Sequence, residues 1–146
     1  MMDVKIAQDT FGVYDVEVAD GDVAGVEGFD TSIFIALGTD ARAPVEKVSR
    51  PELRRGWMGD LVSDHVLGSL LWLVEQRRLT QGTLNEVVDY ARQALAYFVS
   101  ENIAKSITVD ASITPKVGIS LTIVITAPDG SEVTRYLPLW RVTGAV

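Results

Sequence analysis

The sequence predicts an α+β fold, with an N-terminal β segment and central helices packed on a C-terminal antiparallel sheet. Three observations predict this class. Apolar and polar residues alternate near the N-terminus, apolar residues recur at helical spacing in the middle of the chain, and alternation returns in the C-terminal third. Strands that gather at both ends of a chain, with helices between them, favour an antiparallel sheet. The length of 146 residues corresponds to a single domain over residues 1–146.

Composition and charge exclude several functional classes. The chain is 47% apolar and 23% charged, close to the average of globular domains. Its net charge of −7 argues against nucleic acid as a partner, because a phosphate backbone requires a basic face. With no cysteine and one histidine, His65, disulfides, thiol chemistry and a multi-histidine metal site within one chain are excluded. We find no signal-peptide pattern and no apolar run that could span a bilayer, so we expect no membrane partner.

The N-terminal third predicts short strands followed by a helix. Two strands are expected within residues 3–18, where valine and isoleucine alternate with polar neighbours. Glycine-rich turns are expected between residues 21 and 28. Residues 30–38 are typical of a short helix, with Asp30 as its N-cap and Gly38 ending it in a left-handed conformation.

The middle of the chain begins with an irregular connection. Residues 39–60 contain two prolines and no clear period, and so long a loop in a compact domain is often functional. The loop ends in the string RRGWMGD at residues 54–60. A helix is expected over residues 61–77, buried on most sides because apolar residues cover nearly all its faces. Gly68 within it indicates close approach by another backbone.

A second amphipathic helix and three strands follow. The helix is expected over residues 84–101, and Thr83 and Glu86 form a capping box at its start. A Pro-Asp-Gly turn separates the last two strands. The three strands of the C-terminal third are expected at residues 107–113, 119–125 and 133–140.

Two clusters of polar residues invite a chemical interpretation. Asp60, Asp64 and His65 lie close in sequence, and a carboxylate beside a histidine suits acid–base catalysis. Helix capping by Asp60 or Asp64 explains the cluster better, because no nucleophilic serine accompanies it. The Asp-Gly-Asp string at residues 20–22 resembles the start of a calcium loop, but the later ligands are missing, so a turn is the better interpretation.

Glycoside hydrolysis requires two carboxylates, one of them with a raised pKa. The helical candidates are Glu75, Glu86 and Glu101, and none has a visible partner in the sequence. RRGWMGD follows no strand and lacks the glycine spacing of a phosphate-binding loop. The sequence therefore predicts neither an enzyme nor a bound cofactor or metal.

Interface chemistry accounts better for the remaining residues. Tryptophan, tyrosine and arginine are enriched at binding hot spots, although Trp72 and Tyr97 are expected to lie mostly in the core. Arg54 and Arg55 suit an anion clamp, ion pairs with a neighbouring subunit, or ion pairs within the chain. The candidate protein-interface residues are Arg54, Arg55, Trp57, Asp60, Arg135, Tyr136 and Trp140.

Several strings together resemble the Mu-type baseplate protein family of contractile-tailed phages. They are RRGWMGD, GSLLWLVEQRRLT at residues 68–80, YARQALAYFV at 90–99, YDVEV and GDVAGVEGFDTSI within 14–33, and TDARA at 39–43. Members tend to carry an arginine-rich stretch before Gly-Trp-Trp-Gly-Asp, and then Gly-Ser-x-Leu-Trp-Leu. The resemblance covers residues 10–140, and the strings are specific in combination rather than singly.

This family is similar to the sheath-initiator proteins of larger baseplates, also called lysozyme-like. The resemblance implies a small α+β domain in the virion, at the tail baseplate, assembled in the host cytoplasm. It implies binding to wedge and hub proteins, seeding of the tail sheath by shared β-strands, and the tail tube as a further candidate partner. The C-terminal strand, residues 131–140, is the candidate sheet edge, and Pro138 suits an edge position.

The sequence also departs from the family pattern. Where the wider group has Glu-Pro-Arg at the end of the long helix, residues 99–102 read Val-Ser-Glu-Asn, so no role of that motif is carried over. Met58 replaces the second tryptophan, and Tyr97-Phe98 stands where a tryptophan is common. Two alternatives to a structural role remain open: a peptidoglycan hydrolase of the tail tip, and an unrelated adaptor.

Overall fold

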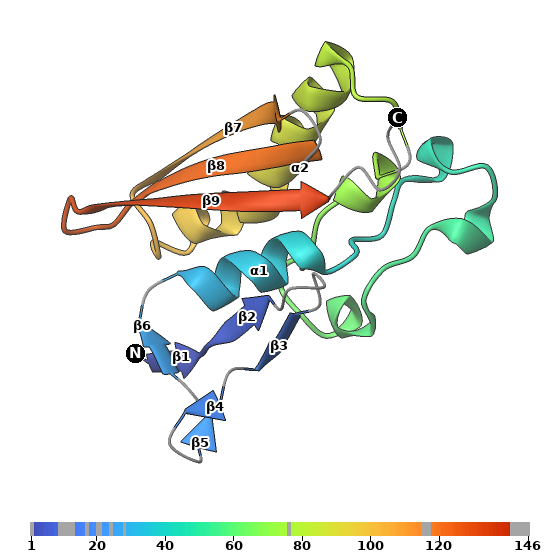
Figure 1. The fold of residues 1–146 in the computed structure, drawn as a ribbon. Coiled ribbons are helices and arrows are strands. Elements are labelled where there is room, and N and C mark those ends of the chain that lie inside the picture. Colours follow the sequence, from blue (N-terminus) through green and yellow to red (C-terminus); the bar gives the residue numbers. More distant parts are fainter. Residues whose placement is uncertain are drawn as a thin grey trace.

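The computed structural model describes residues 2–8, 14–16, 18–19, 22–23, 25–27, 29–75, 77–114 and 118–140. Two helices and a three-stranded antiparallel sheet form the main body, and short strands of the N-terminal part lie beyond α1 (Figure 1). The α+β class is therefore confirmed. Among the described residues, no helix combines the length and the hydropathy that crossing a membrane requires.

The N-terminal strands are more numerous than the two expected within residues 3–18. They pair antiparallel in three separate ribbons, β1 with β6, β2 with β3 and β4 with β5. Each strand has only two or three residues, too few for alternation to reveal them. Their bounds are β1 (Met2–Val4), β2 (Ile6–Gln8), β3 (Tyr14–Val16), β4 (Val18–Ala19), β5 (Asp22–Val23) and β6 (Gly25–Glu27). The Asp-Gly-Asp string at 20–22 lies partly outside the described residues.

Helix α1 (Asp30–Gly38) forms where it was expected, but both of its predicted caps were wrong. The N-cap is Phe29, and Asp30 lies in the first turn, where its carboxylate forms an ion pair with Arg135 on the sheet. Gly38 is the last helical residue, and the chain leaves through Thr39 in an extended conformation. Both differences have a tertiary cause. Asp30 binds Arg135 of the sheet instead of capping the helix. The chain leaves the helix through Thr39, whose carbonyl accepts a hydrogen bond from the Ser69 N–H.

The helix expected over residues 61–77 was wrong. Instead the chain forms two short 3₁₀ turns, η3 (Met58–Leu61) and η4 (Leu71–Leu73), separated by a segment of turns and bends. Apolar residues on every face lack the single 3.6-residue stripe that stabilises a helix against a core. Gly68 adopts φ +108°, which an α-helix does not allow. The close backbone approach at Gly68 is confirmed, since a Cβ there would lie 2.5 Å from the Thr39 carbonyl oxygen.

Helix α2 (Gln81–Ser100) is the expected amphipathic helix, but it starts three residues before position 84. Its N-cap is Thr80, whose hydroxyl accepts a hydrogen bond from the Thr83 N–H at 3.2 Å. The predicted capping box one turn later was wrong, because Thr83 Oγ donates to the Arg78 carbonyl at 2.7 Å. The buried residues of α2 are Thr83, Leu84, Val87, Tyr90, Ala91, Ala94, Leu95 and Phe98.

The C-terminal sheet confirms the three predicted strands. It consists of β7 (Ser106–Thr114), β8 (Gly118–Thr126) and β9 (Glu132–Trp140) in the order β7-β8-β9. The central strand β8 buries Ile119, Leu121, Ile123 and Ile125 completely, and α2 packs against this face. The alternate residues of the sheet form its other face, which is rich in threonine and serine.

The loop between α1 and α2 contains two further 3₁₀ turns, η1 (Val45–Lys47) and η2 (Pro51–Leu53). The irregular connection expected over residues 39–60 is therefore confirmed in character. Lys47 Nζ fastens the loop to α2, where it donates to the Tyr90 hydroxyl at 3.0 Å. This hydrogen bond raises the pKa of Lys47 above its ordinary value.

We predict that Gly68→Ala destabilises the fold by about 3 kcal/mol, because it adds a backbone clash to a left-handed φ. Gly130 is a matched control, with φ +90° and no atom within 4 Å of an added Cβ. Gly130→Ala should therefore show the φ strain alone, about 1 kcal/mol. Urea unfolding of both variants measures the difference, and equal losses would contradict a clash at Gly68.

Candidate functional site

Two of the strings singled out in the sequence, RRGWMGD and GSLLWLVEQRRLT, meet at a third, Thr39–Ala43, which we call the clasp. The clasp first holds RRGWMGD. The Ala43 N–H donates to the Arg54 carbonyl at 2.9 Å, and Arg54 Nε donates to the Ala43 carbonyl at 2.6 Å. This reciprocal pair fixes the start of RRGWMGD, and it engages the Arg54 side chain within its own chain.

The other side of the clasp holds the string GSLLWL. The Ser69 N–H donates to the Thr39 carbonyl at 2.9 Å, and the Ala41 N–H donates to the Ser69 carbonyl at 3.0 Å. Trp72 Nε1 then donates to the Ala41 carbonyl at 3.0 Å. Both ends of the intervening chain, residues 56–68, are thus held at one place. We call residues 56–68 the arm.

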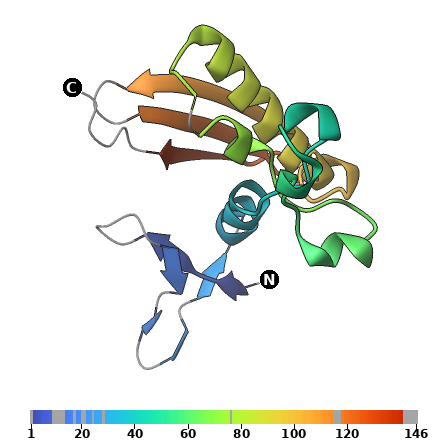
Figure 2. The same ribbon diagram turned by 90° about the vertical axis from the view of Figure 1, so that its right-hand side faces the viewer.

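The arm is an Ω-shaped loop, a kind of segment that is often functional. It reaches outward past α1 and near the C-terminal end of α2 (Figure 2). At its base, Arg55 has φ 53° and Gly56 has φ +113°. A side chain at Gly56 would meet Arg42 Cβ at 2.9 Å, so the glycine allows a close approach to the clasp.

Arg55 takes the intrachain alternative of the three that the sequence left open. Its Nη1 donates to Asp40 Oδ2 at 2.8 Å, and its guanidinium lies 4.5 Å from the centre of the Trp72 ring. Half of the Arg55 side chain is exposed, so this ion pair stabilises the fold by less than about 1 kcal/mol. Its structural effect is to hold a left-handed arginine at the base of the arm.

Within the arm, Trp57 and Asp60 fix the turn η3. The indole of Trp57 covers Gly59 so closely that any Cβ there would overlap the ring. Asp60 Oδ1 accepts a hydrogen bond from the Leu67 N–H at 2.9 Å, which joins the outgoing and returning parts of the arm. Capping of a helix by Asp60 or Asp64 was therefore wrong, because the chain returns as a loop.

His65 lies flat against α2 rather than in the first turn of a helix. Its ring is stacked on Tyr97 with centroids 5.0 Å apart. Burial raises the pKa of the Tyr97 hydroxyl above its ordinary value. Asp60 and His65 thus each have a partner that explains their position without catalysis.

The sequence interpretation missed the exposure of three large apolar side chains of the arm. Met58, Leu61 and Val62 are 86%, 88% and 91% exposed. Leu61 and Val62 were expected within a buried helix, and Met58 stands where the family pattern has a tryptophan. The missed signal is the lack of helical period around Val62, where Ser63 and Asp64 interrupt the apolar run. A solvent-exposed apolar group on a fixed loop is typical of a binding surface.

The second candidate surface is the outer edge of β9. The Ala127 N–H donates to the Ser131 carbonyl at 2.8 Å, so hydrogen-bonded and non-hydrogen-bonded pairs alternate along β9 from that point. By this alternation, the N–H and C=O groups of Thr134 and Tyr136 point away from β8. Pro138, which has no N–H, falls at an equivalent position and agrees with this assignment.

One side chain, that of Arg135, covers part of the outer edge of β9. Arg135 Nη1 donates to the Thr134 carbonyl at 3.1 Å, and Arg135 Nε forms the ion pair with Asp30 of α1. Tyr136 is 75% exposed, and no described residue forms a backbone hydrogen bond with its outward N–H or C=O group. Trp140 pairs through its backbone with Ile119, and its side chain lies outside the described part of the chain.

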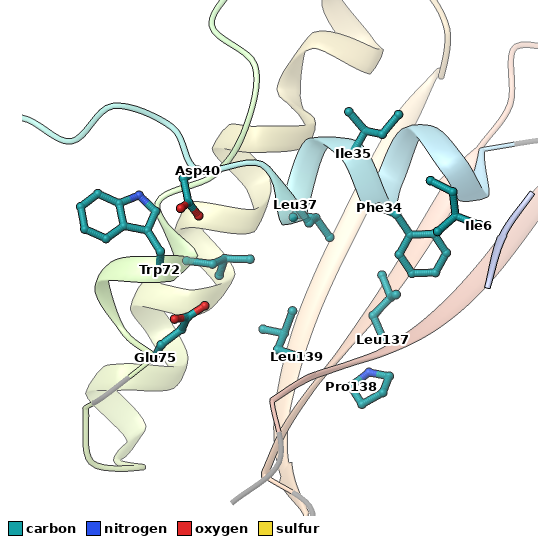
Figure 3. Close-up of a pocket in the computed structure, with 12 residues that line it drawn as sticks. Ile6, Phe34, Ile35, Leu37, Asp40, Trp72, Glu75, Leu137, Pro138 and Leu139 are labelled. Atoms are coloured by element: carbon teal, nitrogen blue, oxygen red, sulfur yellow. The ribbon is translucent and has the colours of Figure 1, made fainter. Parts of the chain in front are cut away.

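An apolar groove of about 330 Å³ lies between α1, η4 and the end of β9. Phe34, Leu137 and Leu139 line its apolar part, and Asp40 and Glu75 lie toward the end formed by Trp72 (Figure 3). A smaller cavity of about 100 Å³ lies between α1 and Arg135, and Tyr136 borders it. Leu137 lines both this cavity and the groove.

The three glutamates considered for hydrolysis occupy unrelated places. Glu86 accepts two hydrogen bonds from Arg77 Nη1 at 2.7 and 2.8 Å, on the surface of α2. Glu75 borders the groove, and Glu101 follows the end of α2. Among the described residues, no cluster of three or more acidic or histidine side chains has the geometry to hold a metal ion.

We predict that Arg55→Gly is less destabilising than Arg55→Ala by about 0.5–1 kcal/mol. Both variants lose the ion pair and the stacking on Trp72, but only glycine accepts a positive φ without strain. Chemical denaturation of the two proteins gives the difference directly. If the Arg55→Ala protein were more stable than the Arg55→Gly protein, residue 55 would not adopt the left-handed conformation. Asp40→Asn serves as a control for loss of the ion pair alone.

Comparison with known proteins agrees with the motifs of the clasp and the arm. A family model described as phage protein GP46 matches residues 29–132. Baseplate protein gp46 of Escherichia phage Mu is 34% identical over 110 residues, which cover 73% of this chain and 75% of that protein. The Mu-like prophage FluMu protein gp46 of Haemophilus influenzae is also 34% identical over 110 residues, with 75% and 76% covered.

The extent of these matches excludes one of the open alternatives, an unrelated adaptor. The matched region runs from α1 to the first residue of β9, and so includes the clasp, the arm and α2. An unrelated adaptor that resembles the family by chance would not match over this length. The chain belongs to the phage protein GP46 family.

Proposed function

We propose that this chain is a non-enzymatic structural component of a contractile phage tail baseplate, and that a tail sheath subunit adds a β-strand to the edge of β9. The first part is supported by the relative from phage Mu, which bears the name baseplate protein. The second part rests on one observation, the outward N–H and C=O groups of Tyr136, a residue that borders a small cavity between α1 and β9.

Strand addition suits an initiator because it needs little sequence complementarity. Main-chain hydrogen bonds supply affinity, and pockets for alternate side chains supply specificity. A strand paired with Tyr136 would direct every second side chain toward the groove lined by Leu137 and Leu139. Arg135, which covers the Thr134 carbonyl and binds Asp30, would limit the strand to the C-terminal half of β9 or move aside.

Wedge and hub proteins are the partners proposed for the other surfaces. Arg54, Arg55 and Asp60 are engaged within the chain, so their contribution to such contacts is the shape of the arm. Trp57 is 48% exposed and remains a direct contact candidate. The net charge of −7 complements basic surfaces on neighbouring subunits.

We predict that Tyr136→Pro abolishes sheath formation while the protein still folds. Proline removes the outward N–H at an edge position, which sheet edges tolerate. Tyr136→Ala is the control, because it removes the side chain and retains the N–H. The assay is electron microscopy of tails from a phage whose own copy of the gene is replaced by each variant. Normal sheaths with Tyr136→Pro would exclude strand addition at this edge.

Trp57→Ala should harm baseplate assembly more than folding. Half of the indole is exposed, so its loss costs about 1–2 kcal/mol of stability, whereas interface tryptophans are frequent hot spots. Thermal unfolding followed by circular dichroism reports the first effect, and the amount of variant in purified particles reports the second. Parallel losses in both measurements would make Trp57 a residue of folding alone.

A further inference from the structure

The apex of the arm carries an apolar ridge that the fold itself does not use. Met58 and Leu61 are the first and last residues of the 3₁₀ turn η3, and side chains three residues apart eclipse in such a turn. Val62 follows directly. All three side chains are more than 85% exposed, the highest values among the exposed large hydrophobic residues of the described chain.

This exposure belongs to a fixed loop, with restraints on both sides of the ridge. Just before it, Trp57 places its ring over Gly59. Within it, Asp60 accepts a hydrogen bond from the Leu67 N–H at 2.9 Å, and after it, His65 stacks on Tyr97 of α2. The ridge is thus presented in one geometry, and a partner need not order it on binding.

The charge of the arm indicates which kind of partner surface the ridge would fit. Residues 56–68 contain two aspartates and no lysine or arginine. Asp60 is engaged by the Leu67 N–H, whereas Asp64 is exposed and forms no ion pair with any described residue. An apolar ridge bordered by an unpaired carboxylate fits an apolar pocket with a lysine or arginine at its rim.

The same charge argues against the other occupants. An acidic border on a chain of net charge −7 opposes contact with an anionic bilayer, and it opposes contact with a second copy of the chain. The turn η3, which carries the ridge, lies on the side opposite the arrowhead of β9 in the view of Figure 2. Occupation of the ridge and addition of a strand to β9 can therefore occur at the same time.

We infer that the Met58–Leu61–Val62 ridge docks into an apolar pocket with a basic rim on another protein of the same assembly. The inference depends on the proposed baseplate role in one respect: that role tells us to search for the partner among the baseplate proteins. The chain then has two docking surfaces, the ridge and the edge of β9, and links two neighbours.

Site-specific cross-linking tests this inference. The full chain, with p-benzoylphenylalanine in place of Val62, is co-expressed with the other baseplate proteins of its phage, and cross-linked peptides are identified by mass spectrometry. We expect one partner segment that is rich in apolar residues and has a lysine or arginine within a few positions. A cross-link to a second copy of the chain, or none in assembled baseplates, would overturn the inference.

Matched variants separate the ridge from general hydrophobicity. Met58→Ser with Val62→Ser should lower the affinity for the identified partner at least tenfold and leave unfolding unchanged. The control is the double variant Val45→Ser with Leu53→Ser, because these half-exposed apolar residues lie in η1 and η2, outside the arm. The affinity of the control variant for the partner should stay within twofold of that of the unmodified chain. Similar losses in both pairs would refute a specific role for the ridge.

Charge and membrane controls complete the test. Asp64→Lys should weaken binding more than Asp64→Asn, and the difference should shrink at high salt. Co-sedimentation with vesicles of phosphatidylcholine and phosphatidylglycerol should be negative, and binding to them would overturn the inference. Absence of the chain from particles would refute the baseplate role. Normal incorporation together with unaltered binding of the ridge variant would refute the ridge alone.

Discussion

The backbone hydrogen bonds of the clasp, Thr39–Ala43, are the interaction on which the rest of the site depends. They join Arg54 on one side and Ser69 on the other, so a long irregular stretch leaves and re-enters the body at one point. Each bond contributes only about 0.5–1.5 kcal/mol. Their joint effect is geometric, because they determine where the arm projects and turn three separated sequence motifs into one structural unit.

The clasp also divides the molecule into two parts with different physical tasks. Helix α2 and strand β8 form the apolar core, in which residues such as Phe98 and Ile123 are almost completely buried. The arm contributes little to this core and instead exposes its own apolar side chains. The model of the GP46 family begins at residue 29 and ends at residue 132, so both parts lie in the matched region.

The edge of β9 illustrates how a fold restrains a sticky surface. An exposed strand edge invites unwanted pairing, and charged side chains on it are a common safeguard. Arg135 performs this task here by covering the Thr134 carbonyl while it binds Asp30. The groove beside Leu137 and Leu139 stays accessible, so the proposed strand addition has room at the C-terminal half of the edge even while Arg135 holds Asp30.

The sequence alone located helix α1, although neither residue expected to cap it does so. The sequence also determined the fold class, helix α2 and the three C-terminal strands, because α2 and these strands have a clear hydrophobic period. It also placed RRGWMGD at a structurally special position and identified the family. Only the tertiary structure decided the path of residues 54–69. Their apolar residues carry no period, and their conformation is set by hydrogen bonds to the distant clasp. The intrachain partners of Arg55 and Arg135 were likewise decided there, since long-range ion pairs leave no local pattern. The exposure of Met58, Leu61 and Val62 was also decided by the tertiary structure. The sequence shows that a side chain is apolar, but it does not show whether the fold buries that side chain or leaves it in water.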